Sequence, residues 1–251
     1  MTDLHRFQSF DGVSIGYRTL GDPAGWPTVM LHGFLASAES NWFLPGIAAA
    51  VAATGRRVIA PDLRGHGRSD APSDPAAWPP DVLARDQEAL VAHLHLSDYD
   101  LVGYSLGART AVRMLTRGAR PSKLVLAGMG ERGLMEAGAR AAMFEDAIRH
   151  GEAARDPRAG RHHRPHPPAG GLKPEAMLGV LASFAATSAE AIAAIDVPTL
   201  VVAGQRDDDN GSVEALAAMM ADARAVRVPG DHLSAVMEPA LAEAIVGFLE
   251  D

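Results

Sequence analysis

A serine, Ser105, stands at the centre of a Gly-x-Ser-x-Gly motif over residues 103–107. The motif follows an apolar run over 99–102 and precedes an alanine-rich run over 108–115 that is typical of a helix. A strand that turns sharply into a helix holds the central serine in strained backbone geometry, with its hydroxyl above the sheet. The Leu106 amide at the helix N-terminus would then stabilise an oxyanion formed on a substrate at Ser105. We therefore predict that Ser105 is a nucleophile.

A serine hydroxyl needs a base to take its proton, and that base needs a carboxylate behind it. A short β-rich run near the C-terminus ends in Gly-Asp-His at His232, which we predict to be the base. Between the two, an apolar run over 198–204 leads to three consecutive aspartates, Asp207, Asp208 and Asp209. The chain order serine, acid, histidine is the order expected when the serine follows a strand of a parallel α/β sheet.

In these features the chain resembles the α/β-hydrolase superfamily along essentially its whole length. The stretches that carry the resemblance are Val29-Met30-Leu31-His32-Gly33-Phe34, residues 60–69, the serine motif, Gly204-x-x-Asp207 and Gly230-Asp231-His232. In such proteins the acid is the third residue after the glycine that ends the strand, which implies Asp207, with Asp208 next and Glu131 a further candidate. The resemblance also implies that the Phe34 N–H is a second oxyanion donor beside the Leu106 N–H.

The resemblance implies a mostly parallel, eight-stranded α/β-hydrolase sheet with helices on both faces. The strands and helices predicted from the sequence pattern agree with it. Predicted strands cover residues 7–10, 13–20, 28–31, 57–60, 99–103, 123–127, 199–203 and 225–228. Predicted helices cover residues 40–53, 80–94, 106–117, 212–221 and 239–250. The first two strands alternate apolar and polar residues, as antiparallel edge strands do, and the central strands are short apolar runs typical of parallel strands. The alternation of strands and helices places the site at the carboxyl edge of the sheet.

One segment, residues 130–197, separates two predicted strands by far more chain than a crossover needs. We predict a single domain over 1–251 with a small helical cap inserted at about 131–197, helical over 134–150 and 174–187. Apolar cap residues and residues near the motifs are the candidates for substrate contacts: His32, Arg109, Met129, Met143 and Phe184. Between the cap helices, His162, His163 and His166 stand among arginines and prolines, which favours a lid loop over a metal site. No metal and no cofactor is expected.

The composition limits the partners. The net charge of −8 argues against nucleic acid, which requires a basic surface. The longest continuous apolar stretch, Ile47–Ala53, is too short to span a bilayer, and no secretory signal is visible at the N-terminus. The absence of cysteine excludes disulfides and thiol catalysis and suits a cytoplasmic location. A monomer or homodimer acting on a small molecule is expected.

The resemblance implies a serine hydrolase that cleaves a carboxylic ester, thioester or lactone through an acyl-enzyme. A second reading is a lyase, because the chain also resembles a menaquinone-pathway enzyme that eliminates pyruvate with a similar triad. In that enzyme the arginine four residues after the serine binds a carboxylate, which would make Arg109 a ligand. Two further alternatives remain open, a cofactor-free perhydrolase and a ligand receptor that has the fold without turnover.

Overall fold

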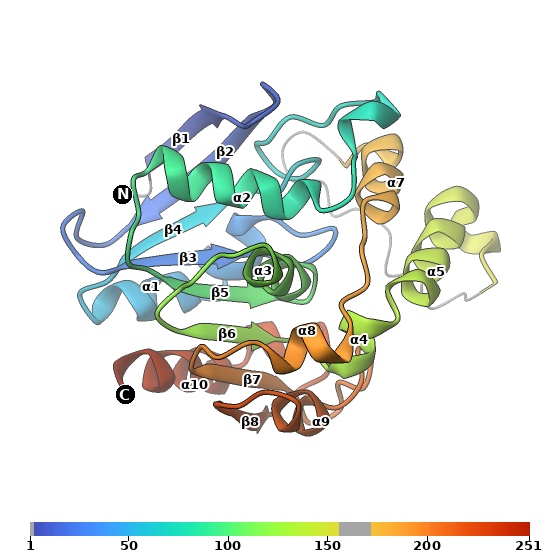
Figure 1. Ribbon diagram of the computed structural model, residues 1–251. Coiled ribbons are helices and arrows are strands. Elements are labelled where there is room, and N and C mark those ends of the chain that lie inside the picture. The colour runs from blue at the N-terminus through green and yellow to red at the C-terminus, as the bar shows by residue number, and fades with distance from the viewer. Residues whose placement is uncertain (1–2, 156–171) are drawn as a thin grey trace.

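The computed structural model describes residues 3–155 and 172–251, which form one eight-stranded sheet covered by helices (Figure 1). The strands are β1 (Asp3–Gln8), β2 (Ser14–Leu20), β3 (Pro27–Leu31), β4 (Arg57–Pro61), β5 (Asp100–Tyr104), β6 (Leu124–Ala127), β7 (Thr199–Gly204) and β8 (Ala223–Val228). Their order in the sheet is β1-β2-β4-β3-β5-β6-β7-β8. Strand β2 pairs antiparallel with β1 and β4, and every other neighbouring pair is parallel. The predicted fold class is therefore confirmed.

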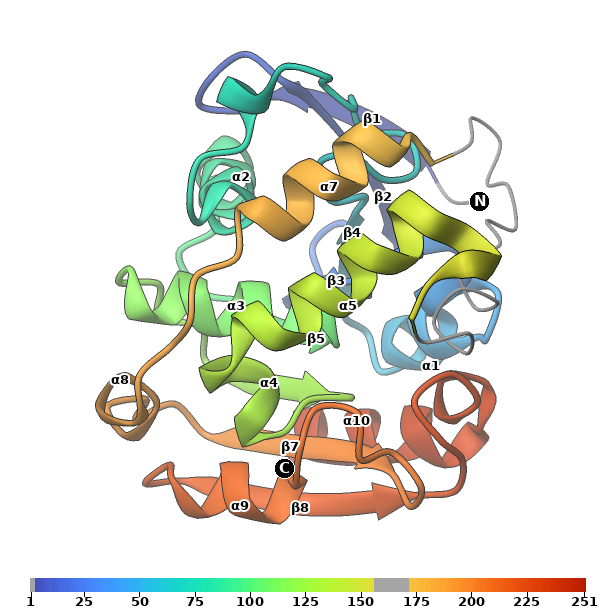
Figure 2. The same cartoon turned by 90° about the vertical axis from the view of Figure 1, so that its right-hand side faces the viewer.

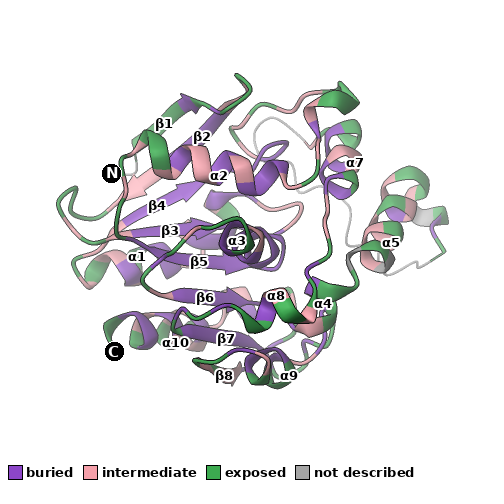
Figure 3. Cartoon of the chain, in the orientation of Figure 1, coloured by how far each residue is buried: buried purple, intermediate pink, exposed green. Residues whose placement is uncertain are grey.

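The helices lie on both faces of the sheet (Figure 1). On one face are α2 (Val82–His93), α3 (Leu106–Thr116), α8 (Ala189–Ala193) and α9 (Val213–Ala218), and on the other are α1 (Ile47–Ala53) and α10 (Pro239–Glu250). Alternate residues of each central strand feed the two cores, because successive side chains of a strand point to opposite faces. In β6, Leu124 and Leu126 enter the core under α3, whereas Val125 enters the core under α10. The central strands are accordingly buried along their length (Figure 3).

Two predicted elements in the first part of the chain differ clearly from the structure in their bounds. The first strand was predicted over 7–10 but spans Asp3–Gln8, because the chain turns at once after it: the Gly12 N–H donates to the Ser9 carbonyl and the Ser9 N–H to Val13. The helix predicted over 40–53 divides into a π-helical turn, Glu39–Phe43, and α1. Gly46 separates them with φ of 85°, a backbone conformation that glycine adopts without strain.

Three further helices, α4 (Glu131–Met135), α5 (Ala137–His150) and α7 (Pro174–Ala182), lie beyond the carboxyl ends of the strands (Figures 1 and 2). We call α4, α5 and α7 the cap helices. The helix predicted over 134–150 begins earlier and breaks at Glu136, and the helix predicted over 174–187 ends at Ala182. Helix α8, which the sequence analysis missed, begins after Ser188, whose hydroxyl accepts the Ala191 N–H. Within the described part of the chain, no helix is long and apolar enough to cross a membrane.

Candidate active site

Ser105 joins β5 to α3 in a strained turn. Its φ of 51° and ψ of −107° are rare for a residue with a side chain, and its N–H donates to the Ala127 carbonyl of the neighbouring strand at 2.8 Å. Leu106 is the first residue of α3, so its N–H is one of the amides that have no partner within the helix. Ser105 therefore lies at the carboxyl edge of the sheet beside a helix N-terminus, as the motif predicts.

The two glycines of the motif are required by close approach. A Cβ at Gly103 would lie 2.4 Å from the carbonyl carbon of Gly107, and a Cβ at Gly107 would lie 2.0 Å from the Leu31 carbonyl oxygen. Neither contact can relax by rotating a side chain, because the obstructing atoms belong to the backbone. The small residues thus allow α3 to begin directly against β3 and β5.

Ser105, His232 and Asp207 form a hydrogen-bonded chain of side chains. The Nε2 atom of His232 is 3.0 Å from the Ser105 Oγ, and its Nδ1 atom is 2.9 Å from the Asp207 Oδ2. Asp207 accepts the bond as a carboxylate when His232 carries its proton on Nδ1, which leaves Nε2 free to accept the serine proton. The structure thus brings together the three side chains that the sequence analysis selected.

The three consecutive aspartates have different surroundings. Asp207 is 3 % exposed and bonds to His232, whereas Asp208 and Asp209 are exposed. The Asp209 carboxylate instead pairs with Arg140 of α5 at 3.3 Å. The geometry therefore favours Asp207 over Asp208 as the acid.

Tyr104 holds His232 in place, and Gly128 leaves room for the rings of both. The sequence analysis missed both residues. The Tyr104 hydroxyl donates to the His232 carbonyl at 2.7 Å, and the Tyr104 ring centroid is 5.6 Å from that of the imidazole. Gly128 has φ of 60°, and a Cβ on it would lie 2.9 Å from the Tyr104 ring and 3.3 Å from the His232 Cε1. The only available signals were the tyrosine within the serine motif and the Gly-Met-Gly that follows β6.

The loop that carries Asp207 is bound to the first cap helix. The buried Asn210 donates from Nδ2 to the Gly128 carbonyl and accepts the Gly133 N–H at its own carbonyl, both at 2.8 Å. Glu131, a further candidate for the acid, accepts the Ser212 N–H at 2.7 Å and so binds this loop from the side. No local sequence pattern pointed to Asn210, because its partners are distant along the chain.

The chain after β3 runs beside the chain after β5. Leu31 is paired with Gly103 in parallel register, and a Cβ on Gly33 would lie 3.7 Å from the Cβ of Ser105. Phe34 follows Gly33 directly, so its amide lies on the loop that borders Ser105. This placement agrees with the predicted pairing of the Phe34 amide with the amide that follows Ser105.

His32 corrects one predicted substrate contact. It is fully buried, its Nδ1 is 2.7 Å from the Gly33 carbonyl, and its Nε2 accepts the Leu63 N–H at 2.9 Å. Both ring nitrogens are therefore occupied by the backbone, and burial lowers the pKa of His32 to about 4. His32 is not available to a substrate.

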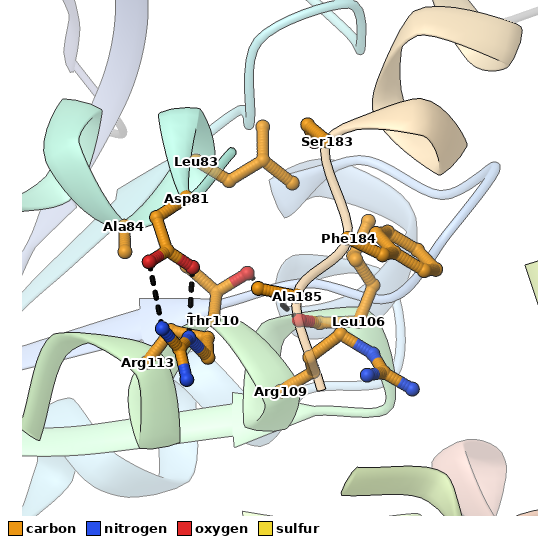
Figure 4. A pocket seen from close by; sticks show the side chains of 10 residues that line it. All are labelled: Asp81, Leu83, Ala84, Leu106, Arg109, Thr110, Arg113, Ser183, Phe184 and Ala185. Atoms are coloured by element: carbon orange, nitrogen blue, oxygen red, sulfur yellow. Dashed lines mark hydrogen bonds and ion pairs between the residues drawn. The ribbon is translucent and has the colours of Figure 1, made fainter. Parts of the chain in front are cut away.

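Arg109 and Phe184 line one pocket (Figure 4). Arg109 is 5 % exposed, its Nη2 donates to the Gly133 carbonyl, and its guanidinium carbon is 4.8 Å from the Phe184 ring centroid. Its Nη1 is buried and has no hydrogen-bond partner among residues 3–155 and 172–251. Burial, with repulsion from Arg140 and Arg113, lowers the pKa of Arg109 to about 10. The pocket, of about 20 Å³, is also lined by Asp81, Leu83, Ala84, Leu106, Thr110, Arg113, Ser183 and Ala185.

The two methionines predicted to contact a substrate do not line this pocket. Met129 is 2 % exposed in the main core, where its sulfur is 2.4 Å from the position of a Cβ on Gly133. Met143 packs with Ala147 and Ala154 in a separate cluster of the cap helices. Their contact with a substrate stays a prediction.

One group of side chains has the composition of a metal site. Ligand atoms of Asp207, Asp209 and His232 lie within 4.8 Å of one another. Both ring nitrogens of His232, however, already have partners, so a metal ion would have to displace Asp207 or Ser105. The histidines at 162, 163 and 166 and most of the predicted lid loop lie outside the described residues.

Comparisons with known proteins agree with this arrangement. Residues 27–137 match the family model of the α/β hydrolase fold. A curated non-heme chloroperoxidase of Streptomyces lividans is 37% identical over 119 residues, which is 47% of this chain and 40% of that protein. A 2-hydroxymuconate semialdehyde hydrolase of Pseudomonas sp. (strain CF600) is 37% identical over 123 residues, 46% of this chain and 41% of that protein. The matches thus span less than half of these relatives.

The solved structures match over nearly the whole chain. An esterase, RhEst1 from Rhodococcus sp. ECU1013, has a TM-score of 0.76 and 25% identity, with 99% of this chain and 98% of that chain covered. A hydrolase from Pseudomonas aeruginosa PA01 has a TM-score of 0.77 and 26% identity, with 99% of each chain covered. From the sheet order, the strained serine turn and these likenesses, we conclude that the chain has the α/β-hydrolase fold.

Proposed function

We propose that the protein is a serine hydrolase that cleaves a carboxylic ester, thioester or lactone through an acyl-enzyme. The observation that carries the proposal is the chain of hydrogen bonds from Ser105 through His232 to the buried Asp207, at the carboxyl edge of the sheet. The esterases among the structural relatives, RhEst1 and one from Exiguobacterium antarcticum, and an enol-lactonase from Burkholderia xenovorans LB400 support this class of substrate.

The first half of the reaction forms the acyl-enzyme. The Ser105 Oγ attacks the carbonyl carbon while the His232 Nε2 takes its proton, and Asp207 holds the imidazole and stabilises the imidazolium. The carbonyl oxygen becomes an oxyanion that the amides of Phe34 and Leu106 bind. Collapse of this intermediate breaks the bond to the leaving oxygen or sulfur, which receives the proton from His232. Ser105 then carries the acyl group as an ester.

The second half releases the acid. His232 takes a proton from water as the water attacks the acyl carbon, and returns that proton to the Ser105 Oγ as the ester bond breaks. An alkyl-enzyme, as in haloalkane dehalogenases and epoxide hydrolases that resemble this fold, requires a carboxylate where this chain has Ser105. Acyl transfer is therefore the chemistry that the serine supports.

The cap insertion, at about 131–197, is proposed to enclose the acyl group. Phe144 of α5 packs against Phe34, and the centroids of the two rings are 5.1 Å apart. The pocket beside Leu106 has a volume of about 20 Å³, which holds about one water molecule.

Hydrolysis of p-nitrophenyl esters from acetate to decanoate tests the proposal. We expect turnover with an optimum at one acyl length, because the pocket that receives the acyl group limits which chains fit. Labelling by a fluorophosphonate probe provides an independent measure of the reactive serine. A folded protein that neither labels nor turns over any ester would contradict the proposal and favour a ligand receptor.

A second candidate function is elimination from an anionic substrate, and the surroundings of Arg109 favour it. A buried arginine without a carboxylate partner is unusual, because removing a charge from water costs several kcal/mol when it is not compensated. Among the described residues Arg109 contacts a carbonyl and a ring, and its Nη1 has no hydrogen-bond partner. A substrate carboxylate would supply the missing acceptor. Labelling by the probe without ester turnover would favour this candidate.

Arg109→Leu is expected to distinguish anionic from neutral substrates. A charge-assisted hydrogen bond contributes about 1.5–3 kcal/mol, so kcat/KM for p-nitrophenyl hydrogen glutarate should fall about 10- to 150-fold. The neutral p-nitrophenyl valerate, with the same acyl length, should change by less than about threefold. Arg117→Leu is the control, because Arg117 lies at the C-terminal end of α3 and makes an ion pair with Glu88 of α2. Equal losses for both esters would mean that Arg109 only braces α4 through Gly133.

A further inference from the structure

Side chains bind three backbone groups of the loop from Gly33 to Leu35, which we call the oxyanion loop. The Gly33 N–H donates to the buried Asn41 Oδ1 at 2.9 Å, and the Gly33 carbonyl is 2.7 Å from the His32 Nδ1. The Leu35 N–H donates to the His66 Nε2 at 3.2 Å. The Phe34 N–H lies between these contacts. The loop needs such support, because Leu35 has φ of 61°, which is strained for a leucine.

His32 sets the direction of the Phe34 N–H. The Gly33 carbonyl and the Phe34 N–H belong to one peptide plane, and in a trans peptide they point in opposite directions. Among the described residues no peptide bond is cis. Because the His32 Nε2 accepts the Leu63 N–H, the ring proton is on Nδ1 and is donated to the Gly33 carbonyl. Because His32 binds this carbonyl on one side of the loop, the Phe34 N–H points to the opposite side.

His66 fixes the next peptide plane in the same way. Its Nε2 accepts the Leu35 N–H, so its proton is on Nδ1, 3.1 Å from the Arg64 carbonyl. The ring is 1 % exposed, and its centroid is 5.1 Å from that of His32 and 5.8 Å from that of Phe34. The two histidines thus bind consecutive peptide planes on either side of Phe34.

We propose that His32 and His66 are positioning residues for the oxyanion hole: as neutral rings with the proton on Nδ1, they hold the Phe34 N–H toward the substrate carbonyl on Ser105. The inference rests on the proposed acyl-transfer function. It assigns to His32 a role in orienting the oxyanion loop, in place of the predicted contact with a substrate.

The surroundings of the two rings keep them neutral. Burial lowers the pKa of His32 to about 4, and burial with repulsion from His32 lowers the pKa of His66 to about 3. The carboxylate that faces His66, Asp62, already accepts the N–H groups of Ala38 and Arg68, each at 2.8 Å. Above these pKa values both rings can accept a backbone N–H at Nε2. A second proton on either ring would be on Nε2, where it would face a backbone N–H and leave that N–H without an acceptor.

His66→Leu and His66→Gln test the role in catalysis, with His93→Gln on the exposed end of α2 as control. Glutamine offers an acceptor near the position of Nε2, and leucine offers none. We expect His66→Leu to lower kcat about 10- to 100-fold with KM nearly unchanged. This is less than the loss of a whole oxyanion donor, which lowers kcat about 10²- to 10³-fold, because the Phe34 N–H is misdirected and not removed. His66→Gln should recover most of the loss. The Ki of a trifluoromethyl ketone, whose adduct on Ser105 carries an oxyanion, should rise in parallel with the loss in kcat/KM.

A second measurement does not depend on activity or on the folding of the variants. Long-range ¹H–¹⁵N NMR of the histidine-labelled wild-type protein at pH 7 should show both rings neutral with the proton on Nδ1. A proton on Nε2, or a charged ring, at either residue overturns the inference. So does a folded His66→Leu variant with unchanged kcat and Ki. Absence of ester turnover by the wild type, with both tautomers as expected, would instead contradict the proposed function.

Discussion

Ser105→Ala is expected to lower kcat for the best p-nitrophenyl ester by at least about 10³-fold, because it removes the hydroxyl that is proposed to form the acyl-enzyme. The fold should remain, because alanine retains the Cβ and the Ser105 N–H still donates to Ala127. The measurement is kcat beside Tm, and we expect Tm to change by no more than a few degrees. Labelling by the fluorophosphonate probe should disappear with the activity.

The matched control for Ser105→Ala is Ser9→Ala. Ser9 is also buried, but it does not line the pocket beside Leu106, and its hydroxyl donates to the Asp86 Oδ1 at 2.5 Å. Its removal should affect stability more than chemistry. Retained turnover and labelling in Ser105→Ala would refute the nucleophile, and equal loss in both variants would indicate a general effect of truncating a buried serine.

The second large effect is expected at Asp207. Asp207→Asn keeps the size of the side chain but can present its amide to the His232 Nδ1, which favours the tautomer with the proton on Nε2. In that tautomer Nε2 faces the Ser105 hydroxyl as a donor and cannot take its proton. We expect kcat to fall about 10³- to 10⁴-fold, with a smaller effect on KM.

Asp208→Asn makes the same chemical change one residue further along the chain and serves as the control. Asp208 is exposed, so its substitution should change kcat by less than about threefold. A severe loss in Asp208→Asn with an active Asp207→Asn would show that the loop adopts another register in the working enzyme. The pair therefore tests the assignment of the acid independently of the stability of the fold.

Most of the sheet was predictable because its signals are local. A buried parallel strand is a short apolar run, and no bound of β5, β6 or β7 differs from the prediction by more than one residue. The errors occur at the ends of elements, as at the turn after β1, where the Gly12 N–H donates to the Ser9 carbonyl. The first cap helix begins before the predicted bound, at Glu131, where the carbonyl of Asn210 accepts the Gly133 N–H of the first turn from outside the helix.

The features of the candidate site also differ in whether a local pattern could predict them. The sequence by itself determined the serine turn, the histidine and the chain order of the triad, because each depends on residue types next to a strand end. Only the tertiary structure decided which aspartate faces His232, and that His32 binds the oxyanion loop from behind. It also decided that Arg109 is buried without a carboxylate partner among the described residues. These properties depend on atoms that lie far apart in the sequence and meet only when the strands align, so no local pattern records them.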